Sequence, residues 1–306
     1  MSLTEWQSAT LKETTSVTDR SQADAHLQNW KLTLAYDGTD FQGWQVQPGL
    51  VTIQGELQAA LGRITGESPL PQGSGRTDAG VHALGQVASF ALRAPIPAAN
   101  LHRALNRTLP PSIRVLAAEL APIAFHARHS AVAKTYEYRI FREPLCPPFL
   151  ARYVYACPWT LDLDKLQACA RIFSGEHDFL SFAASDPDLS ERESGVQLDG
   201  AGACGAPRIG PRSTVRIIHS SAWEQRAGDS GALLVYRVCG NGFLHHMVRN
   251  LVGTMLDVGR GQLDPHEIPA ILAARDRTAA GPTAPARGLF LHSVEYEKTE
   301  FRPDQD

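Results

Sequence analysis

The segment 73–83, GSGRTDAGVHA, places one carboxylate and one guanidinium in a loop of small residues. Its glycines have the spacing of the first half of a Walker A phosphate loop, but Val81 and His82 stand where that motif requires Lys and Ser or Thr. A dinucleotide-binding turn is also disfavoured, because Asp78 would repel a pyrophosphate. Asp78 is therefore either a reacting carboxylate or an aspartate that hydrogen-bonds its own backbone in a glycine-rich turn.

A second strong cation lies far along the chain. Arg249 stands beside an apolar stripe whose members step by four, three and four residues, which is the spacing of one helix face. That stripe predicts a helix over 244–255, with Arg249 off the apolar face and one turn from His245. Arg249 is either a functional partner for a carboxylate or an exposed helix arginine.

The histidines and cysteines predict no metal centre and no disulfide framework. His245 and His246 are adjacent, and adjacent residues on a helix face in different directions. His126 and His129 have one-turn spacing without a nearby carboxylate in the sequence, and no H-E-x-x-H motif occurs. The five cysteines form no C-x-x-C pair. A G-x-S-x-G nucleophile pattern is also missing.

Two tyrosines in the segment 134–139, KTYEYR, share one face of a predicted strand, with charged residues on the other face. Aromatic residues on one strand face usually belong to a core. They can equally stack on a nucleobase that has been pulled out of a helical stem. Tyr136 is therefore a candidate for either role.

Composition describes an ordinary globular chain. It has 306 residues, of which 43% are hydrophobic, and a formal net charge of −3. That charge alone speaks weakly against a protein that coats nucleic acid, although most of its basic residues are arginines, which suit phosphate and base recognition. The sequence lacks an apolar run of membrane-spanning length and a signal-peptide pattern, so we expect a cytoplasmic protein.

Hydrophobic periodicity predicts strands alternating with helices in two successive runs. Thr52 is a plausible N-cap for the second element of the first run. The first run is a strand at 30–36, a helix from 53, strands at 86–92, 113–120 and 134–140, and a helix at 101–106. The second run is a helix at 163–173, strands at 213–220, 232–238 and 289–296, and helices at 244–255 and 265–275. This order predicts an α+β fold rather than a Rossmann fold.

Several motifs together resemble the tRNA pseudouridine synthase A family. They occur in the family's order and span about 30–297, which is nearly the whole core. GRTDAGVHA is the most specific of them. The matching segments are YDGTDFQGWQ (36–45), TIQGELQAAL (52–61), GRTDAGVHA (75–83), FHAR (125–128), KTYEY (134–138), GNGFLHHMVRN (240–250) and GLFLHSVEY (288–296).

The resemblance implies two related α+β domains, each a mixed, mostly antiparallel sheet backed by helices, with a basic cleft between them and a homodimeric assembly. The expected organisation is a disordered tail at 1–28, an N-terminal domain at 29–140 that carries Asp78, a C-terminal domain at 141–298 with a variable insertion near 186–211, and a tail at 299–306. A net acidic chain would then have to cluster its arginines in the cleft. The candidates for this cluster are Arg103, Arg107, Arg139, Arg216 and Arg249.

The activity implied by the resemblance is the conversion of uridine to pseudouridine in the anticodon stem-loop of tRNA, at positions 38 to 40, without a metal or an organic cofactor. Asp78 then corresponds to the essential aspartate and Arg249 to its ion-pair partner. Arg76 corresponds to the residue that helps displace the target base, Tyr136 to the ring that stacks on it and Leu289 to an apolar wall of the pocket. Two other interpretations are a tRNA-binding module or folding chaperone on the same scaffold, and a eukaryotic-type relative that modifies other positions.

Overall fold

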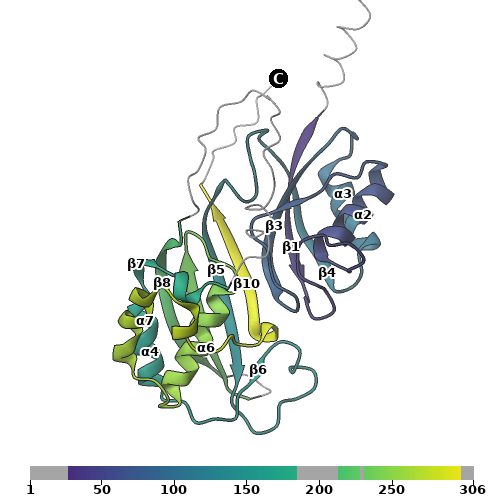
Figure 1. Ribbon diagram of the computed structural model, residues 1–306. Helices are drawn as coiled ribbons and strands as arrows, with labels where there is room; N and C mark the ends of the chain where they lie inside the picture. Colours follow the sequence, from purple (N-terminus) through teal and green to yellow (C-terminus); the bar gives the residue numbers. More distant parts are fainter. Residues whose placement is uncertain (1–26, 185–212, 228–230, 298–306) are drawn as a thin grey trace, which may run out of the picture. The chain divides into compact units, whose positions relative to one another are not determined.

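A computed structural model describes residues 27–184, 213–227 and 231–297 (Figure 1). The described residues form two compact units. Unit 1 contains 27–77 and 85–130, and unit 2 contains 78–84, 131–184, 213–227 and 231–297.

Unit 1 is a small sheet with two helices. Its strands are β1 (Gln28–Tyr36), β2 (Gln72–Gly73), β4 (Ile113–Ala121) and, from Gly85 onward, β3 (His82–Leu92). The order is β4, β1, β3, with β2 paired to β3. The helices are α2 (Ile53–Thr65) and α3 (Ala98–Thr108).

Local sequence explains the elements of unit 1. Alternate residues of β1 are buried, so this strand contributes Trp30, Leu32 and Leu34 to the core. Helix α2 begins where the Thr52 hydroxyl accepts a hydrogen bond from the Gly55 N–H, and it ends at a left-handed glycine. The N-cap predicted at Thr52 is thus confirmed.

Unit 2 has a larger sheet. Its strands are β5 (Ala131–Phe141), β6 (Tyr155–Ala156), β7 (Gly175–Asp178), β8 (Val215–Arg226), β9 (Leu233–Gly240) and β10 (Leu289–Tyr296). The order is β10, β5, β9, β8, β7, with β6 on β5. The described neighbours are antiparallel except β5 with β6, and β10 with the first residues of β3.

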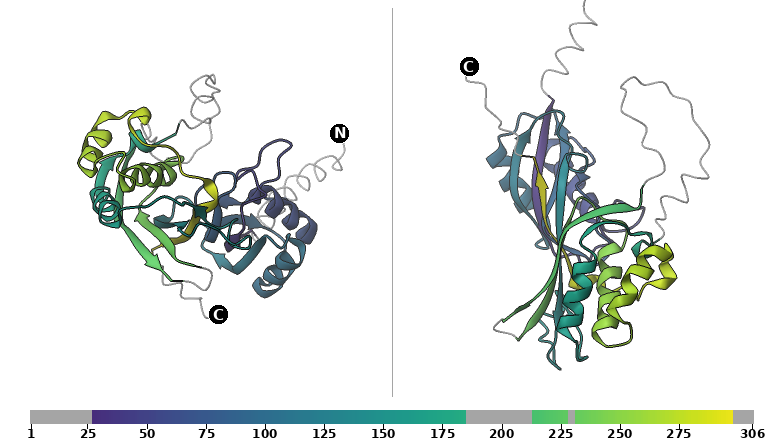
Figure 2. Two further views of the ribbon diagram at one scale, coloured as in Figure 1. Left: turned by 90° about the horizontal axis from the view of Figure 1, so that it is seen from below. Right: turned by 90° about the vertical axis from the view of Figure 1, so that its left-hand side faces the viewer.

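Helices cover one face of the unit 2 sheet (Figure 2). They are α4 (Leu163–Ile172), α6 (Met247–Gly259) and α7 (Ile268–Ala274), with 3₁₀ turns η1 (Leu180–Phe182), η2 (Pro265–Glu267), η3 (Arg277–Ala279) and η4 (Ala286–Gly288). Trp223 on β8 packs its ring on Tyr236 and donates to the Met255 sulfur on α6. The core of unit 2 therefore lies between α6 and the sheet. No helix among the described residues is long and apolar enough to cross a membrane.

The α+β class with a mixed sheet is confirmed, and several boundaries differ from the expectation, two of them close to Asp78 and Arg249. Strand β3 begins at His82 rather than 86, because His82 and Ala83 pair with β10. Helix α6 begins at Met247 rather than 244, because the His245 carbonyl accepts a hydrogen bond from the Ala184 N–H. The residues before Met247 are therefore held outside the helix.

The expected domains at 29–140 and 141–298 stay a prediction. Within the compact units, strand β5 belongs to unit 2, where it lies between β10 and β9. Asp78 also groups with unit 2, because the segment that it opens pairs with β10. Three expected segments lie outside the described residues. They are the N-terminal tail as far as residue 26, the insertion near 186–211 and the tail at 299–306.

Candidate functional site

A tight turn holds Asp78 just before β3. The Val81 N–H donates to the Asp78 carbonyl at 3.1 Å. Gly80 occupies this turn with φ of +75°, a left-handed conformation that glycine adopts without strain. Pairing of His82 with Phe290 on β10 then anchors the end of the turn. The backbone around Asp78 is thus set by one glycine and one strand pair.

Arg249 binds the Asp78 carboxylate. Its Nη1 lies 2.8 Å from Asp78 Oδ2, and the side chains are only 15% and 19% exposed, respectively. The same guanidinium donates from Nε to the Ala284 carbonyl at 2.8 Å. A planar fork that bonds in two directions has little freedom to rotate, so Arg249 fixes the orientation of the carboxylate.

Two histidines complete the surroundings of Asp78. His245 Nε2 lies 3.6 Å from Asp78 Oδ1, and His246 Nε2 lies 3.2 Å from Asp78 Oδ2. Burial lowers the pKa of His246 below its ordinary value, and Asp78 opposes that shift.

The expectation that His245 and His246 point in different directions was wrong. That argument assumed a regular helix, but both residues precede α6, and His246 has φ of +58°. The left-handed turn brings the two rings to a centroid distance of 3.9 Å. Sequence spacing alone carried no sign of this conformation. One available signal was the pair of glycines at 240 and 242, which precedes the histidines closely and favours irregular backbone.

Asn250 secures the loop on which Arg249 depends. Its side chain is fully buried and donates from Nδ2 to the Phe182 carbonyl at 2.7 Å. Its Oδ1 accepts from the Thr283 hydroxyl at 2.7 Å and from Arg277 at 3.1 Å. Thr283 directly precedes Ala284, the carbonyl partner of Arg249. Helix α6 thus binds the same loop at two successive residues.

Tyr136 and Leu289 lie on neighbouring strands of unit 2. Tyr136 on β5 is 8% exposed and meets the Phe243 ring edge-on at 5.0 Å. Leu289 on β10 is 5% exposed and pairs with Tyr138, whose hydroxyl donates to the Pro285 carbonyl. Residues two apart on a strand share a face, so Tyr136, Tyr138 and Leu289 line the same side of the sheet.

Arg76 lies in unit 1, where its Nε donates to Gln45 Oε1 at 3.3 Å. The remaining candidates belong to unit 2, namely Asp78, Tyr136, Arg249 and Leu289. The catalytic and binding roles of all five residues stay predictions.

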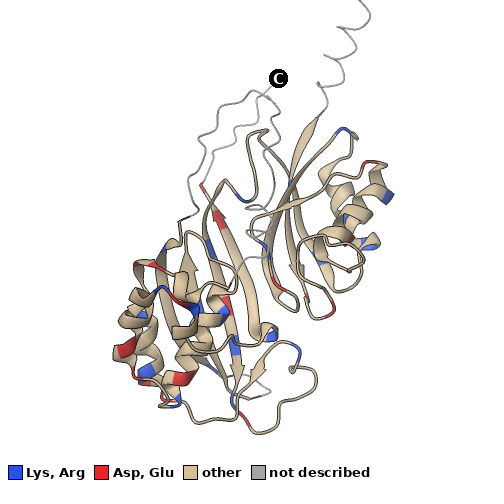
Figure 3. Cartoon of the chain, in the orientation of Figure 1, with Lys and Arg blue, Asp and Glu red and all other residues tan. Residues whose placement is uncertain are grey.

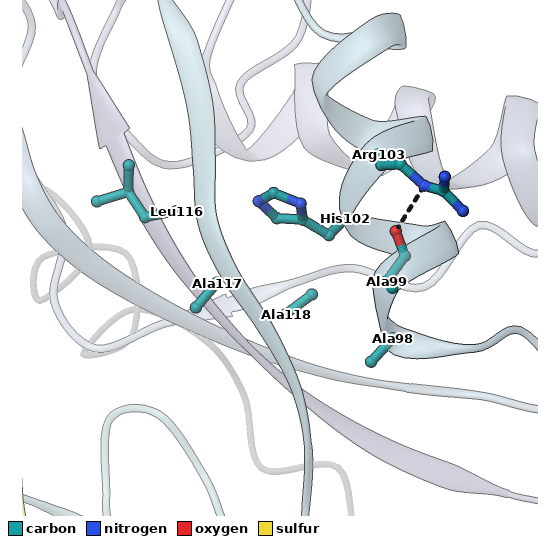
Figure 4. Close-up of a pocket in the computed structure, with 7 residues that line it drawn as sticks. All are labelled: Ala98, Ala99, His102, Arg103, Leu116, Ala117 and Ala118. Atoms are coloured by element: carbon teal, nitrogen blue, oxygen red, sulfur yellow. Dashed lines mark hydrogen bonds between the residues drawn. The ribbon is translucent and has the colours of Figure 1, made fainter.

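An open hollow of about 530 Å³ in unit 1 contains none of these residues. It lies between α3 and β4 (Figure 4), where His102 points toward the strand and bonds the Val115 carbonyl. Arg103 points away from the strand and donates to its own helix at Ala99. The rest of the lining is apolar, namely four alanines and Leu116, so the hollow lacks the carboxylate that the proposed chemistry requires.

Three other arginines of unit 2 gather around one acidic residue. Arg139, Arg226 and Arg237 surround Glu137, which is 1% exposed on the side chain, and Arg139 also stacks over Phe290. Burial by itself raises the pKa of Glu137, but hydrogen bonds from the three arginines outweigh it and lower that pKa to about 2. Basic and acidic residues are interspersed over α4 and α6 (Figure 3). A gathering of arginines in a cleft stays a prediction.

Comparison with known proteins gives one consistent result. The family model described as tRNA pseudouridine synthase matches residues 33–130 and 169–297. The chain is 50% identical over 267 residues to tRNA pseudouridine synthase A of Solibacter usitatus, covering 87% of this chain and 98% of the relative. It is 44% identical over 269 residues to the protein of that name from Moorella thermoacetica, covering 87% and 98%.

Proposed function

The chain belongs to the tRNA pseudouridine synthase family, and from that premise we propose that it isomerises uridines in the anticodon arm of tRNA, at positions 38 to 40. The enzyme class and the tRNA substrate follow from the family. The positions within tRNA and the residue roles are the proposal. The observation that carries it is the ion pair between Asp78 and Arg249 inside the GRTDAGVHA and MVRN segments.

The reaction rearranges one nucleoside without net addition or loss of atoms. The bond from uracil N1 to the ribose C1′ breaks, the base rotates, and C5 bonds to C1′. The C5 proton leaves and N1 gains a proton. An electrophilic sugar must be kept from water between these steps, which requires an enclosed site with apolar walls.

Asp78 supplies the carboxylate that this chemistry requires. It can add to the sugar, stabilise an oxocarbenium-like state, or remove a sugar proton on the way to a glycal. Each route requires the ionised form. Arg249 at 2.8 Å holds and aims the carboxylate. The small residues beside Asp78 let a ribose approach closely.

The remaining site residues bind the displaced base. Extraction of a uridine from a stem costs a few kcal/mol of stacking and pairing. In this proposal Tyr136 stacks on the uracil, Leu289 contributes an apolar wall, and Arg76 fills the space that the base leaves. The phenol ring of Tyr136 is already held edge-on by Phe243, which reduces the entropy cost of stacking.

Two further expectations belong to the proposal: a homodimer, which the resemblance implies, and a cytoplasmic location, which the sequence predicts and which is the compartment of the proposed substrate. Sedimentation equilibrium of the purified full-length chain tests the first. A mass of twice 33.3 kDa supports the dimer, and a mass of 33.3 kDa contradicts it.

The test is position-specific. Unmodified tRNA with uridines at 38 to 40 is incubated with the wild type, with Asp78→Ala, and with Asp164→Ala as a control in the first turn of α4. We expect pseudouridine at these positions from the wild type and the control, and none from Asp78→Ala. Product elsewhere in the tRNA would contradict the proposed positions. Bound tRNA without any product from the wild type would favour a binding module instead.

A further inference from the structure

We propose that Asp78, His245 and His246 bind a zinc-class divalent cation when RNA is absent, and that the bound cation inhibits the enzyme. The metal site is inferred from the geometry of unit 2. The inhibition rests in addition on the proposed catalytic role of Asp78.

The three side chains already converge as metal ligands do. Among the described residues, one carboxylate oxygen and one nitrogen from each histidine lie within 4.8 Å of one another. His246 Nε2 lies 3.2 Å from Asp78 Oδ2, and His245 Nε2 lies 3.6 Å from the other carboxylate oxygen, Oδ1. Zinc binds such atoms at about 2.0–2.2 Å, which puts ligands of a tetrahedral site roughly 3.3–3.6 Å apart. Small side-chain movements therefore suffice to admit the ion.

The donor set selects the class of ion. Two imidazoles and one carboxylate suit zinc and neighbouring transition metals, whereas magnesium and calcium prefer oxygen ligands alone. The side chains of Asp78, His245 and His246 are 19–33% exposed, so an ion can reach them from solvent. Three protein ligands leave a fourth position for water.

Two positive features oppose the cation. Arg249 holds Asp78 Oδ2 at 2.8 Å, and the N-terminal end of α6 begins directly after His246. Metal and guanidinium thus compete for one carboxylate. This competition makes a distinctive prediction. Removal of the arginine weakens catalysis but strengthens metal binding.

The binding experiment uses the full-length chain and Zn²⁺ in competition with a chromogenic chelator. His126→Ala is the control, because His126 and His129 also bring their rings to 4.4 Å in unit 1 but are not joined by a third metal ligand among the described residues. We expect His245→Ala and His246→Ala each to weaken zinc binding at least ~10-fold. His126→Ala should bind as the wild type does, and Arg249→Met should bind more tightly.

Asp78→Asn is a second test of the site, for use if a histidine variant fails to fold, because an amide keeps the shape of the carboxylate. We expect this variant also to weaken zinc binding at least ~10-fold. Equal zinc affinity in the wild type, both histidine variants and Asp78→Asn would overturn the site. So would the absence of zinc binding by the wild type.

Activity distinguishes this inference from the proposed function. We expect zinc to stop pseudouridine formation at the concentrations that fill the site, a chelator to restore it, and excess tRNA to lower the zinc affinity. Full activity with the site filled would overturn the inhibition. A wild type that binds zinc through these residues but never modifies tRNA would contradict the proposed function and leave the metal site standing.

Discussion

Arg249 and Ala284 are tied to each other twice. The Arg249 Nε donates to the Ala284 carbonyl at 2.8 Å, and the Ala284 N–H donates back to the Arg249 carbonyl at 3.1 Å. This leaves Nη1 to bond Asp78 at 2.8 Å. The guanidinium is therefore positioned by the backbone of a loop before any substrate arrives, which is the arrangement that electrostatic preorganisation requires.

Two variants of Arg249 should distinguish the contribution of its positive charge to activity from the contribution of its planar shape. We expect Arg249→Met to lower kcat/KM by about 10²-fold, because the carboxylate loses both its cation and its orientation. Arg249→Lys should fall between Met and the wild type, since an ammonium keeps the charge but cannot bond Asp78 and Ala284 as a planar fork does. Steady-state kinetics on unmodified tRNA measures this order. Equal rates for the Lys and Met variants would show that charge contributes nothing.

Tyr136 should act through its ring and not through its hydroxyl. We expect Tyr136→Phe to retain most activity and Tyr136→Leu to lose roughly 5–150-fold in kcat/KM, the equivalent of about 1–3 kcal/mol for one stacked base. Leu preserves apolar volume but offers no flat face. The comparison requires both variants to unfold at the same urea concentration as the wild type. A Phe variant as weak as the Leu variant would assign the role to the hydroxyl.

Asn250 should contribute to stability and to the position of Arg249 together. Asn250→Ala leaves buried partners at Phe182 and Thr283 without their hydrogen bonds. We expect a loss of about 3 kcal/mol in the free energy of unfolding and a lower kcat. Thr278→Ala is the control from the same loop, since its exposed hydroxyl bonds only Asp276 in the described hydrogen bonds. The control should change stability by less than about 0.5 kcal/mol. Equal effects from both variants would contradict the role of Asn250.

Glu137 should stabilise unit 2 in a pH-dependent way. Because its pKa is lowered to about 2 in the folded protein, the ionised carboxylate contributes stability that is fully present above the unfolded value of 4.5. That stability is lost as pH falls through 2. We expect Glu137→Gln to lower the free energy of unfolding by about 1–3 kcal/mol at pH 7 and by less at pH 3.5. The expected loss is kept small because the three arginines are partly exposed to solvent. Urea unfolding at both pH values measures the difference, and a pH-independent cost would contradict this assignment.

Local patterns predicted most of the elements, because strands and helices bury one face at a characteristic period. Strand β10 has the predicted bounds of 289–296, and the predicted N-cap at Thr52 begins α2. The start of α6 was missed, because the Ala184 contact that holds His245 outside the helix comes from a distant segment. The strand pairing that groups Asp78 with unit 2 is also a long-range contact.

The candidate site could not be predicted from the spacing of residues in the sequence alone. Asp78 and Arg249 are separated by 171 positions, and no periodicity relates them, so their pairing was expected only from the family resemblance. The approach of His245 and His246 to Asp78 was not expected at all. It depends on one left-handed backbone conformation at His246, which the side-chain pattern does not encode.

The most direct measurement follows the hydrogen that the reaction must release. A tRNA transcript labelled with tritium at uracil C5 is incubated with the wild type and with Asp78→Asn, and binding of the same tRNA is measured in parallel. We predict tritium release to water by the wild type, and none by Asp78→Asn with tRNA binding retained. Tritium release by Asp78→Asn at the wild-type rate would contradict the assignment of Asp78 as the reacting carboxylate.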